Sequence, residues 1–160
     1  MGTHYKGSST EVNALNSYIK LTRASESINS RLYMKLAKEG LTESQFYLLD
    51  VLYHCGPMNQ KDLGKKIFRS EGNITMVVNN LVRQKLIKKK QSQDDNRVYI
   101  IKLKNKGKEL YERIFPKFLK TIMSEFEGIK EKEHKEFQKV CKKIGKKPNP
   151  TLPKGKGLLT

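Results

Sequence analysis

The fold of this chain is decided by residues 63–97, LGKKIFRSEGNITMVVNNLVRQKLIKKKQSQDDNR. Apolar residues recur there first at helical spacing, and the pattern then changes to strands separated by a polar turn. Ser70 is a suitable N-cap for a helix over residues 71–85. Strands are predicted over residues 86–90 and 98–103. The stretch therefore predicts a helix-turn-helix followed by a β-hairpin.

Basic residues dominate this stretch. From Gln60 to Arg97 there are ten basic and four acidic residues, and the whole 160-residue chain has a formal net charge of +17. A polyanion is the simplest partner for such an excess of cations, although lysines also occur on merely solvated faces. We therefore expect double-stranded DNA as the partner and a winged-helix DNA-binding module as the fold.

The predicted helix over residues 71–85 has two different sides. On a helical wheel one side is mostly apolar and would face the core, with Ile74, Val77, Val78 and Leu81, and Lys85 falls on the same side. The other side is polar, neutral to basic and able to form hydrogen bonds, with Gly72, Thr75, Met76, Asn79 and Arg83. A face of this kind can lie in the major groove and read base edges.

Five further helices are predicted from apolar periodicity, over residues 11–38, 43–54, 60–67, 106–126 and 131–144. Three residues are placed to cap the second, third and fourth of these, namely Thr42, Asn59 and Asn105. Pro116 lies within the pattern of residues 106–126 and should bend that helix. The fold class is therefore mostly α-helical with a small β-wing.

The length fits one domain with short extensions. We expect a flexible N-terminus over residues 1–10, a single domain over residues 11–144 and a disordered basic tail over residues 145–160. Within the domain, residues 42–103 would form the winged helix-turn-helix, and the helices over residues 11–38 and 106–144 would mediate dimerisation. Their apolar stripes are wider than so small a module can cover, with Leu110, Ile114, Phe118, Ile122, Phe137 and Val140.

Two strings in the sequence resemble parts of the MarR family of bacterial transcriptional regulators. SEGNITMVVNNLVRQKLIKKK, residues 70–90, is similar to the recognition helix and first wing strand of that family. DDNRVYIIKLKNKGKEL, residues 94–110, is similar to its wing tip, second wing strand and following helix. With the order of the predicted helices, the resemblance extends over about residues 13–144.

The resemblance implies a homodimer that grips a palindromic operator. The D-x-R element of the family falls on Asp95 and Arg97, which implies that Arg97 enters the minor groove and that Asp95 orients it. It also implies that the recognition helix lies near the major groove with Ser70, Asn73, Thr75, Met76 and Asn79.

The chain departs from the family pattern at three points. Lys85 stands where the family usually has Gly, so this residue must adopt a left-handed turn or the helix must end differently. Met76 stands where the family often has Arg, which removes one expected contact with DNA. Lys104 replaces the usual Thr ahead of the next helix, leaving Asn105 to cap it.

Each candidate contact has a structural alternative. Arg97 either inserts into a minor groove or pairs with Asp95 to stiffen the hairpin, and both can hold together. The run from Lys88 to Lys90 either contacts phosphates, for which we favour Lys89 and Lys90, or protects a strand edge from aggregation. Asn73 and Asn79 either contact DNA or cap and solvate their helix.

A small-molecule site is a further hypothesis. Arg31, Tyr33 and Tyr47 could line an effector cleft between the dimer body and the winged module, or could be ordinary packing and surface residues. The two cysteines, Cys55 and Cys141, lack metal-ligand spacing and are expected to be structural. We expect no metal, no cofactor and no enzymatic activity, because no phosphate loop, nucleophile–base pair or paired carboxylates are recognisable.

These observations predict a cytoplasmic, dimeric, sequence-specific transcriptional regulator, of the repressor type that a small-molecule effector releases from DNA. The cytoplasmic location follows from the two cysteines and from the absence of a signal peptide or a membrane-spanning apolar run. The alternative is an architectural protein that binds nucleic acids without sequence preference through its basic tail.

Overall fold

The computed structural model describes residues 2–67, 71–93 and 95–146, and Ser70 and residues 147–160 of the predicted tail lie outside them. In chain order the elements are α1 (Ser9–Lys38), α2 (Glu43–Cys55), β1 (Met58–Asn59), α3 (Gln60–Lys66), α4 (Glu71–Arg83), β2 (Ile87–Gln91), β3 (Tyr99–Leu103), α5 (Asn105–Glu125) and α6 (Glu131–Gly145). In the described part of the chain, no helix is both long and apolar enough to cross a membrane.

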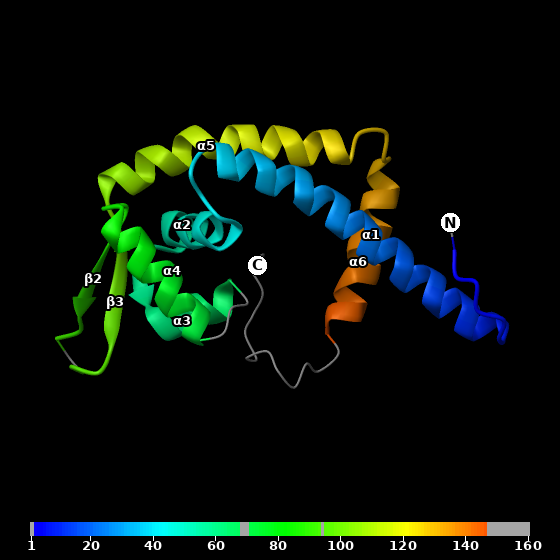
Figure 1. Ribbon diagram of the computed structural model, residues 1–160, viewed down its shortest axis with the longest axis horizontal. Coiled ribbons are helices and arrows are strands. Elements are labelled where there is room, and N and C mark those ends of the chain that lie inside the picture. Colours follow the sequence, from blue (N-terminus) through cyan, green and yellow to red (C-terminus); the bar gives the residue numbers. More distant parts are fainter. Residues whose placement is uncertain (1, 68–70, 94, 147–160) are drawn as a thin grey trace.

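The elements divide into two parts (Figure 1). We call α2, α3, α4 and the sheet the winged lobe, and α1, α5 and α6 the helical arm. The sheet is antiparallel with the order β1-β3-β2, so β2 is an edge strand. Strand β1 was not predicted, because two residues are too few to show an alternating pattern. The predicted architecture, mostly α-helical with a β-wing, is confirmed.

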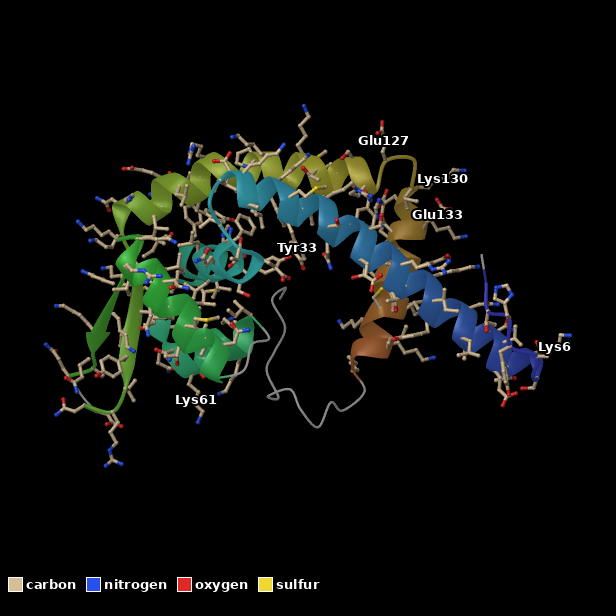
Figure 2. The ribbon with its side chains drawn as sticks, in the orientation of Figure 1. Lys6, Tyr33, Lys61, Glu127, Lys130 and Glu133 are labelled. Carbon is tan, nitrogen blue, oxygen red and sulfur yellow. The ribbon has the colours of Figure 1, made fainter. Side chains whose placement is uncertain are left out.

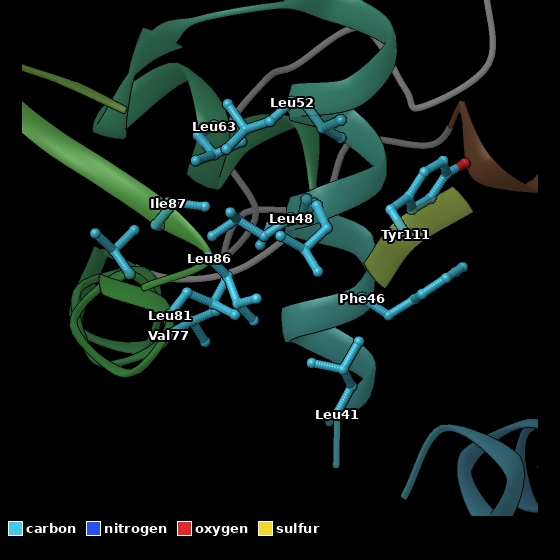
Figure 3. Close-up of a cluster of buried hydrophobic side chains, with 14 of the residues drawn as sticks. Leu41, Phe46, Leu48, Leu52, Leu63, Val77, Leu81, Leu86, Ile87 and Tyr111 are labelled. Carbon is cyan, nitrogen blue, oxygen red and sulfur yellow. The ribbon is translucent and has the colours of Figure 1, made fainter. Parts of the chain in front are cut away.

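The core of the winged lobe is built around α2 (Figure 3). Six residues of this helix are buried, because α1, α4, α5 and the sheet all contact it, namely Gln45, Phe46, Leu48, Leu49, Val51 and Leu52. Leu63 of α3, Leu81 of α4 and Ile101 of β3 are fully buried against the same core. Burying each such side chain stabilises the fold by about 1.5–3 kcal/mol. The same cluster continues into Leu36 of α1 and Tyr111 of α5, so the winged lobe and the helical arm share one core.

The ends of the helices follow local capping chemistry. Helix α1 begins at Ser9 and not at Glu11 as predicted, because Ser8 and Glu11 form a reciprocal capping box in which the Glu11 carboxylate accepts from the Ser8 N–H at 2.9 Å. Thr42 and Asn59 cap α2 and α3 as predicted. The prediction that Asn105 caps the next helix is wrong: α5 begins at Asn105 itself and Lys104 occupies the N-cap.

Helix α4 ends at Arg83, two residues before the predicted end, in a Schellman motif. The Lys85 N–H donates to Val82 O at 2.9 Å, and the Leu86 N–H donates to Leu81 O at 3.0 Å. These two bonds require Lys85 to be left-handed, and its φ is 61°. The expected left-handed turn is therefore present, and a residue with a Cβ adopts it at a cost in free energy.

Helix α5 joins the two parts of the molecule. Tyr111 and Phe118 pack on the Phe46 ring of α2, whereas Ile114 lies beside Leu36 of α1. The three side chains are buried, and α5 therefore contacts both α2 and α1. The prediction that Ile114 and Phe118 belong to an uncovered stripe is therefore wrong, because helices of the same chain bury both side chains. The large apolar side chains that remain exposed on α5 include Leu119 and Met123.

Replacing Lys85 with glycine should stabilise the protein by about 1 kcal/mol, because glycine adopts a positive φ without steric cost. The measurement is the midpoint of urea unfolding. Lys85→Ala is the matched control: it removes the same charge and keeps the Cβ, so it should not stabilise. Equal stabilisation by both variants would show that the lysine charge, and not the backbone, is the source of the strain.

Candidate DNA-binding site

Helix α4 presents the face that was predicted to contact DNA. Ile74, Val77, Val78 and Leu81 are buried, which fixes the rotation of the helix about its axis. The predicted contact residues consequently lie on the outer side: Thr75, Met76, Asn79 and Arg83 are exposed, and Asn73 is half-buried. Ser70 lies outside the described residues. The arrangement leaves one polar helix face open to a duplex.

Two side chains on this face are held by neighbouring residues. The Gln60 amide of α3 donates to the Thr75 hydroxyl at 2.8 Å, which ties the two helices of the helix-turn-helix together. Arg83 donates to the Asn80 side chain at 2.6 Å. Thr75 therefore positions α4 on α3 as well as facing outward, a role that the sequence pattern did not indicate.

The turn of the wing is ordered by main-chain contacts. The Asp95 carboxylate accepts a hydrogen bond from the backbone N–H of Arg97 at 2.9 Å, and the Val98 N–H donates to Asp95 O at 2.9 Å. The side-chain amide of Gln91 donates to Asn96 O across the turn. Asp95 thus shapes the turn from which the exposed Arg97 side chain projects.

A hollow of about 680 Å³ separates the wing from the two helices of the helix-turn-helix. Four cationic side chains contribute to its lining, from α3 (Lys61 and Lys65), from β2 (Lys89) and from the wing turn (Arg97). The ammonium group of Lys89 lies 4.2 Å from the centre of the Tyr99 ring, a cation–π distance that restrains it. The hollow is therefore a concave basic surface, and phosphate groups are the ligands that suit it.

Two residues that line this hollow were not predicted from the sequence to belong to the site. Lys61 and Lys65 were counted as cations but not assigned to the site, because only the fold brings α3 beside the wing (Figure 2). Lys65 forms an ion pair with Asp62 at 2.9 Å, and this hydrogen bond lowers the pKa of the Asp62 carboxyl. Lys61 is more available than Lys65 to bind a phosphate, since no described acid forms an ion pair with Lys61.

The lysines of β2 point to both faces of the sheet. Lys89 lies on the face that borders the hollow and is half-buried, whereas Lys88 and Lys90 are exposed on the opposite face. Of the two predicted phosphate contacts, Lys89 therefore shares the hollow with Arg97 and Lys90 does not.

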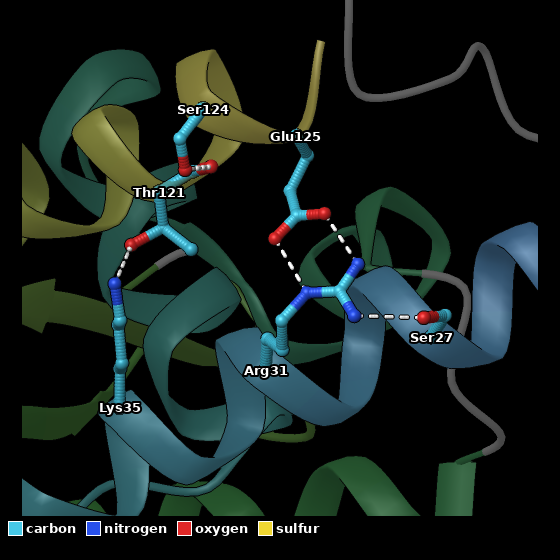
Figure 4. A network of polar contacts seen from close by, with 6 residues as sticks. All are labelled: Ser27, Arg31, Lys35, Thr121, Ser124 and Glu125. Atoms are coloured by element: carbon cyan, nitrogen blue, oxygen red, sulfur yellow. Dashed lines mark hydrogen bonds and ion pairs between the residues drawn. The ribbon is translucent and has the colours of Figure 1, made fainter. Parts of the chain in front are cut away.

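The predicted effector residues contact other parts of the same chain. Arg31 of α1 makes two hydrogen bonds to the Glu125 carboxylate of α5 and a third to Ser27 at 2.8 Å (Figure 4). These contacts hold the pKa of Glu125 below its usual value. Tyr47 packs edge-on against Phe118, and Tyr33 is partly buried against the core. The role of the three in binding an effector stays a proposal.

A second concave surface lies in the helical arm. It is an apolar groove of about 870 Å³ between α1, α5 and α6, with Leu21, Phe126, Phe137, Val140 and Ile144 among its lining residues. Cys141 lies in this groove, whereas Cys55 is exposed at the end of α2. Within the described residues, no three His, Cys, Asp or Glu side chains are grouped so that they could hold a metal ion.

A helix-turn-helix with a basic wing on an α-helical body defines a winged-helix DNA-binding protein. The model of the family "Transcriptional regulator SarA/Rot" matches residues 31–114. The regulator MhqR of Bacillus subtilis is 33% identical over 132 residues, which are 82% of this chain and 91% of that protein. The chain therefore belongs to the SarA/Rot family of transcriptional regulators, whose fold is the MarR-type winged helix.

Solved structures agree with this fold. Sco3205 of Streptomyces coelicolor, a MarR family regulator in complex with DNA, has a TM-score of 0.82 at 14% identity and is matched over 92% of this chain and 94% of its own. The organohalide-sensing regulator RdhR-CbdbA1625, in its 2,4-dichlorophenol-bound form, has a TM-score of 0.75 at 18% identity, with coverages of 90% and 88%. The matched proteins are transcriptional regulators and not enzymes.

Arg97→Ala should weaken DNA binding by about 1–3 kcal/mol per subunit, because the variant has no charged group to place in a narrow minor groove. The melting temperature should hardly change, since the side chain is exposed and its backbone N–H still reaches Asp95. The measurements are DNA affinity by fluorescence anisotropy and thermal unfolding. Asp95→Asn, which keeps an acceptor oxygen for the turn, is the control and should bind nearly as wild type. A structural role for Arg97 would instead lower stability and affinity together.

Proposed function

We propose that the protein is a dimeric, sequence-specific DNA-binding repressor that a small-molecule effector releases from a palindromic operator. The observation that supports this best is the open polar face of α4 beside the basic hollow of the wing. That pairing offers base-reading side chains next to phosphate-binding ones, and sequence-specific recognition needs both kinds of contact. The residues that we assign to the contact are Ser70, Asn73, Thr75, Met76, Asn79, Arg83, Lys89, Lys90 and Arg97.

The helical arm supports the dimer. Helix α6 has no buried residue, although Phe137, Val140 and Ile144 form an apolar face on it and are 48%, 54% and 50% exposed. The facing side of α1 exposes Tyr18 and Leu21 in the same groove. A contiguous apolar surface of this kind is rare on a monomer, and a second copy with the same surface would cover it symmetrically.

Two proteins of similar fold support release by an effector. The structure of RdhR-CbdbA1625 contains 2,4-dichlorophenol, and that of BpsR from Bordetella bronchiseptica concerns regulation by 6-hydroxynicotinic acid. Both folds resemble this chain, and both small molecules named there are aromatic. By analogy we propose an aromatic effector near Tyr33 and Tyr47, beside α1. Repression is the simplest mode for a regulator that such a ligand removes from DNA.

Phe137→Glu combined with Ile144→Glu should convert the dimer into monomers that keep the fold, because both side chains are half-exposed and contribute little to the core of one chain. The measurement is sedimentation velocity at micromolar concentration together with circular dichroism. Lys139→Glu, on the polar side of the same helix, is the control and should stay dimeric. A folded monomer of the wild-type protein would refute the dimer.

Selection of duplexes from a random DNA pool should return a palindrome whose half-sites lie about one helical turn apart, because a two-fold dimer presents two copies of α4. Affinity for the selected duplex should fall steeply as the salt concentration rises, because several lysines and arginines displace counterions from the DNA phosphates when the protein binds. A pool that returns no motif, while bulk DNA binds well, would favour the architectural alternative.

A further inference from the structure

A crevice of about 220 Å³ opens where the last turn of α1 meets the middle of α5. Its floor is apolar, with Leu36 of α1 and Ile114 of α5 buried beneath it and the ring of Phe118 keeping a small exposed part. The alkyl stems of lysines complete the walls. A dry cavity of about 150 Å³ holds one benzene ring. The crevice therefore has room for an apolar body of about six carbons with a small polar head.

The rim of this crevice carries more cations than the acid beside it can neutralise. Lys35, Lys38 and Lys117 line it together with Glu39. Both carboxylate oxygens of Glu39 are already engaged, one by Lys117 at 2.6 Å and the other by Arg113 at 3.3 Å. The bond to Lys117 lowers the pKa of the Glu39 carboxyl, so Glu39 stays ionised and paired. Neither Lys35 nor Lys38 forms an ion pair with a described acid, and both charges are left for a ligand.

Lys35 is held at the crevice by a neutral partner. Its ammonium group donates to the hydroxyl of the buried Thr121 at 2.6 Å, and that hydroxyl donates to Lys117 O at 2.9 Å (Figure 4). An ammonium group has three N–H donors, so two of them stay available to an anion. The dipole of α1 favours cations such as Lys35 and Lys38 in its last turn. The dipole does not explain why Lys35 reaches across to α5 beside a hollow.

The crevice is separate from the place proposed for the aromatic effector. Tyr33 lies on the side of α1 that faces the winged lobe (Figure 2). Lys35 follows Tyr33 by two residues, which turns its side chain by about 200° around the helix axis. The crevice is also separate from the apolar groove, whose lining on α1 ends at Leu32. A ligand of the crevice would therefore leave both of those surfaces free.

We propose that the crevice between α1 and α5 binds a small amphipathic carboxylate, with its head on Lys35 and Lys38 and an apolar body of about six carbons against Phe118 and the lysine stems. The site goes beyond the proposed function, because neither DNA nor the effector near Tyr33 occupies it. A ligand there would contact the Phe118 ring, whose centre lies 4.4 Å from that of Phe46 in α2. Binding would therefore act on the contact that joins α5 to α2.

The test is a titration of the whole protein, with labelled isoleucine methyl groups observed by NMR and with hexanoate and benzoate as probes. Both probes share the carboxylate and differ in the body, a chain in one and a ring in the other. The Ile114 methyl resonance should shift progressively, because Ile114 lies in the floor of the crevice. The resonances of Ile28 and Ile144, which line the apolar groove, should not shift. Hexanamide and benzamide have the same bodies without the charge, and they should bind about tenfold more weakly.

A pair of matched variants tests the two lysines. K35Q/K38Q keeps most of each side chain and should raise the dissociation constant of the carboxylates about tenfold, since two partly exposed ion pairs are lost. K132Q/K139Q removes the same charge from exposed positions of α6 and should bind as wild type. Circular dichroism checks that both variants keep the fold. The proposal is overturned if neither carboxylate shifts Ile114, if the shifts fall on Ile28 or Ile144 instead, if the amides bind as well as the carboxylates, or if K35Q/K38Q binds as wild type.

Discussion

The burial of α2 is the constraint on which the rest of the structure depends. Its Phe46 ring lies 4.4 Å from that of Phe118 and 5.8 Å from that of Tyr111, both of which belong to α5. The Tyr111 hydroxyl donates to Asp50 at 2.6 Å and lies 3.0 Å from His54, so the polar end of this buried ring is also held by α2. Burial, and then the bond to Asp50, raise the pKa of Tyr111 and keep it a hydrogen-bond donor. Because α2 also carries the core of the winged lobe, this joint sets the position of α4 relative to the helical arm.

Ion pairs between α1 and α5 hold the arm along its length. Arg31 pairs with Glu125 towards the end of α5, and Lys117 pairs with Glu39 at 2.6 Å nearer its middle. Both pairs are partly exposed, so each contributes modestly and depends on salt. Their consequence is geometric: α1 and α5 keep a fixed register, and α6 follows from the end of α5. In a dimer built on this arm, the spacing of two α4 helices would depend on these contacts and on the α2–α5 joint together.

The excess of lysine has different consequences in the two parts of the molecule. In the arm, lysines alternate with glutamates and form ion pairs such as Lys135 with Glu131. In the wing, Lys88, Lys90 and Lys102 have no such partner among the described acids, and Lys89 is restrained by an aromatic ring instead. Unpaired cations on a thin sheet weaken the fold and strengthen contact with a polyanion. The described acids therefore neutralise lysines of the arm more than they neutralise those of the wing sheet.

The sequence by itself determined the elements whose cause is local. Apolar periodicity located the six helices of the described chain. Thr42 and Asn59 indicated two N-caps, because each side chain accepts a hydrogen bond from the backbone N–H three residues further on. The string around Asp95 and Arg97 located the wing. The tertiary structure alone decided what depends on distant segments. It paired β1 with β3, buried Ile114 and Phe118 within the shared core, and engaged Arg31 with Glu125, 94 positions away. It also brought Lys61 beside Arg97 and set Lys88 opposite Lys102. Such contacts leave no periodic signal, because they arise from the packing of elements against one another and not from the geometry of any one of them.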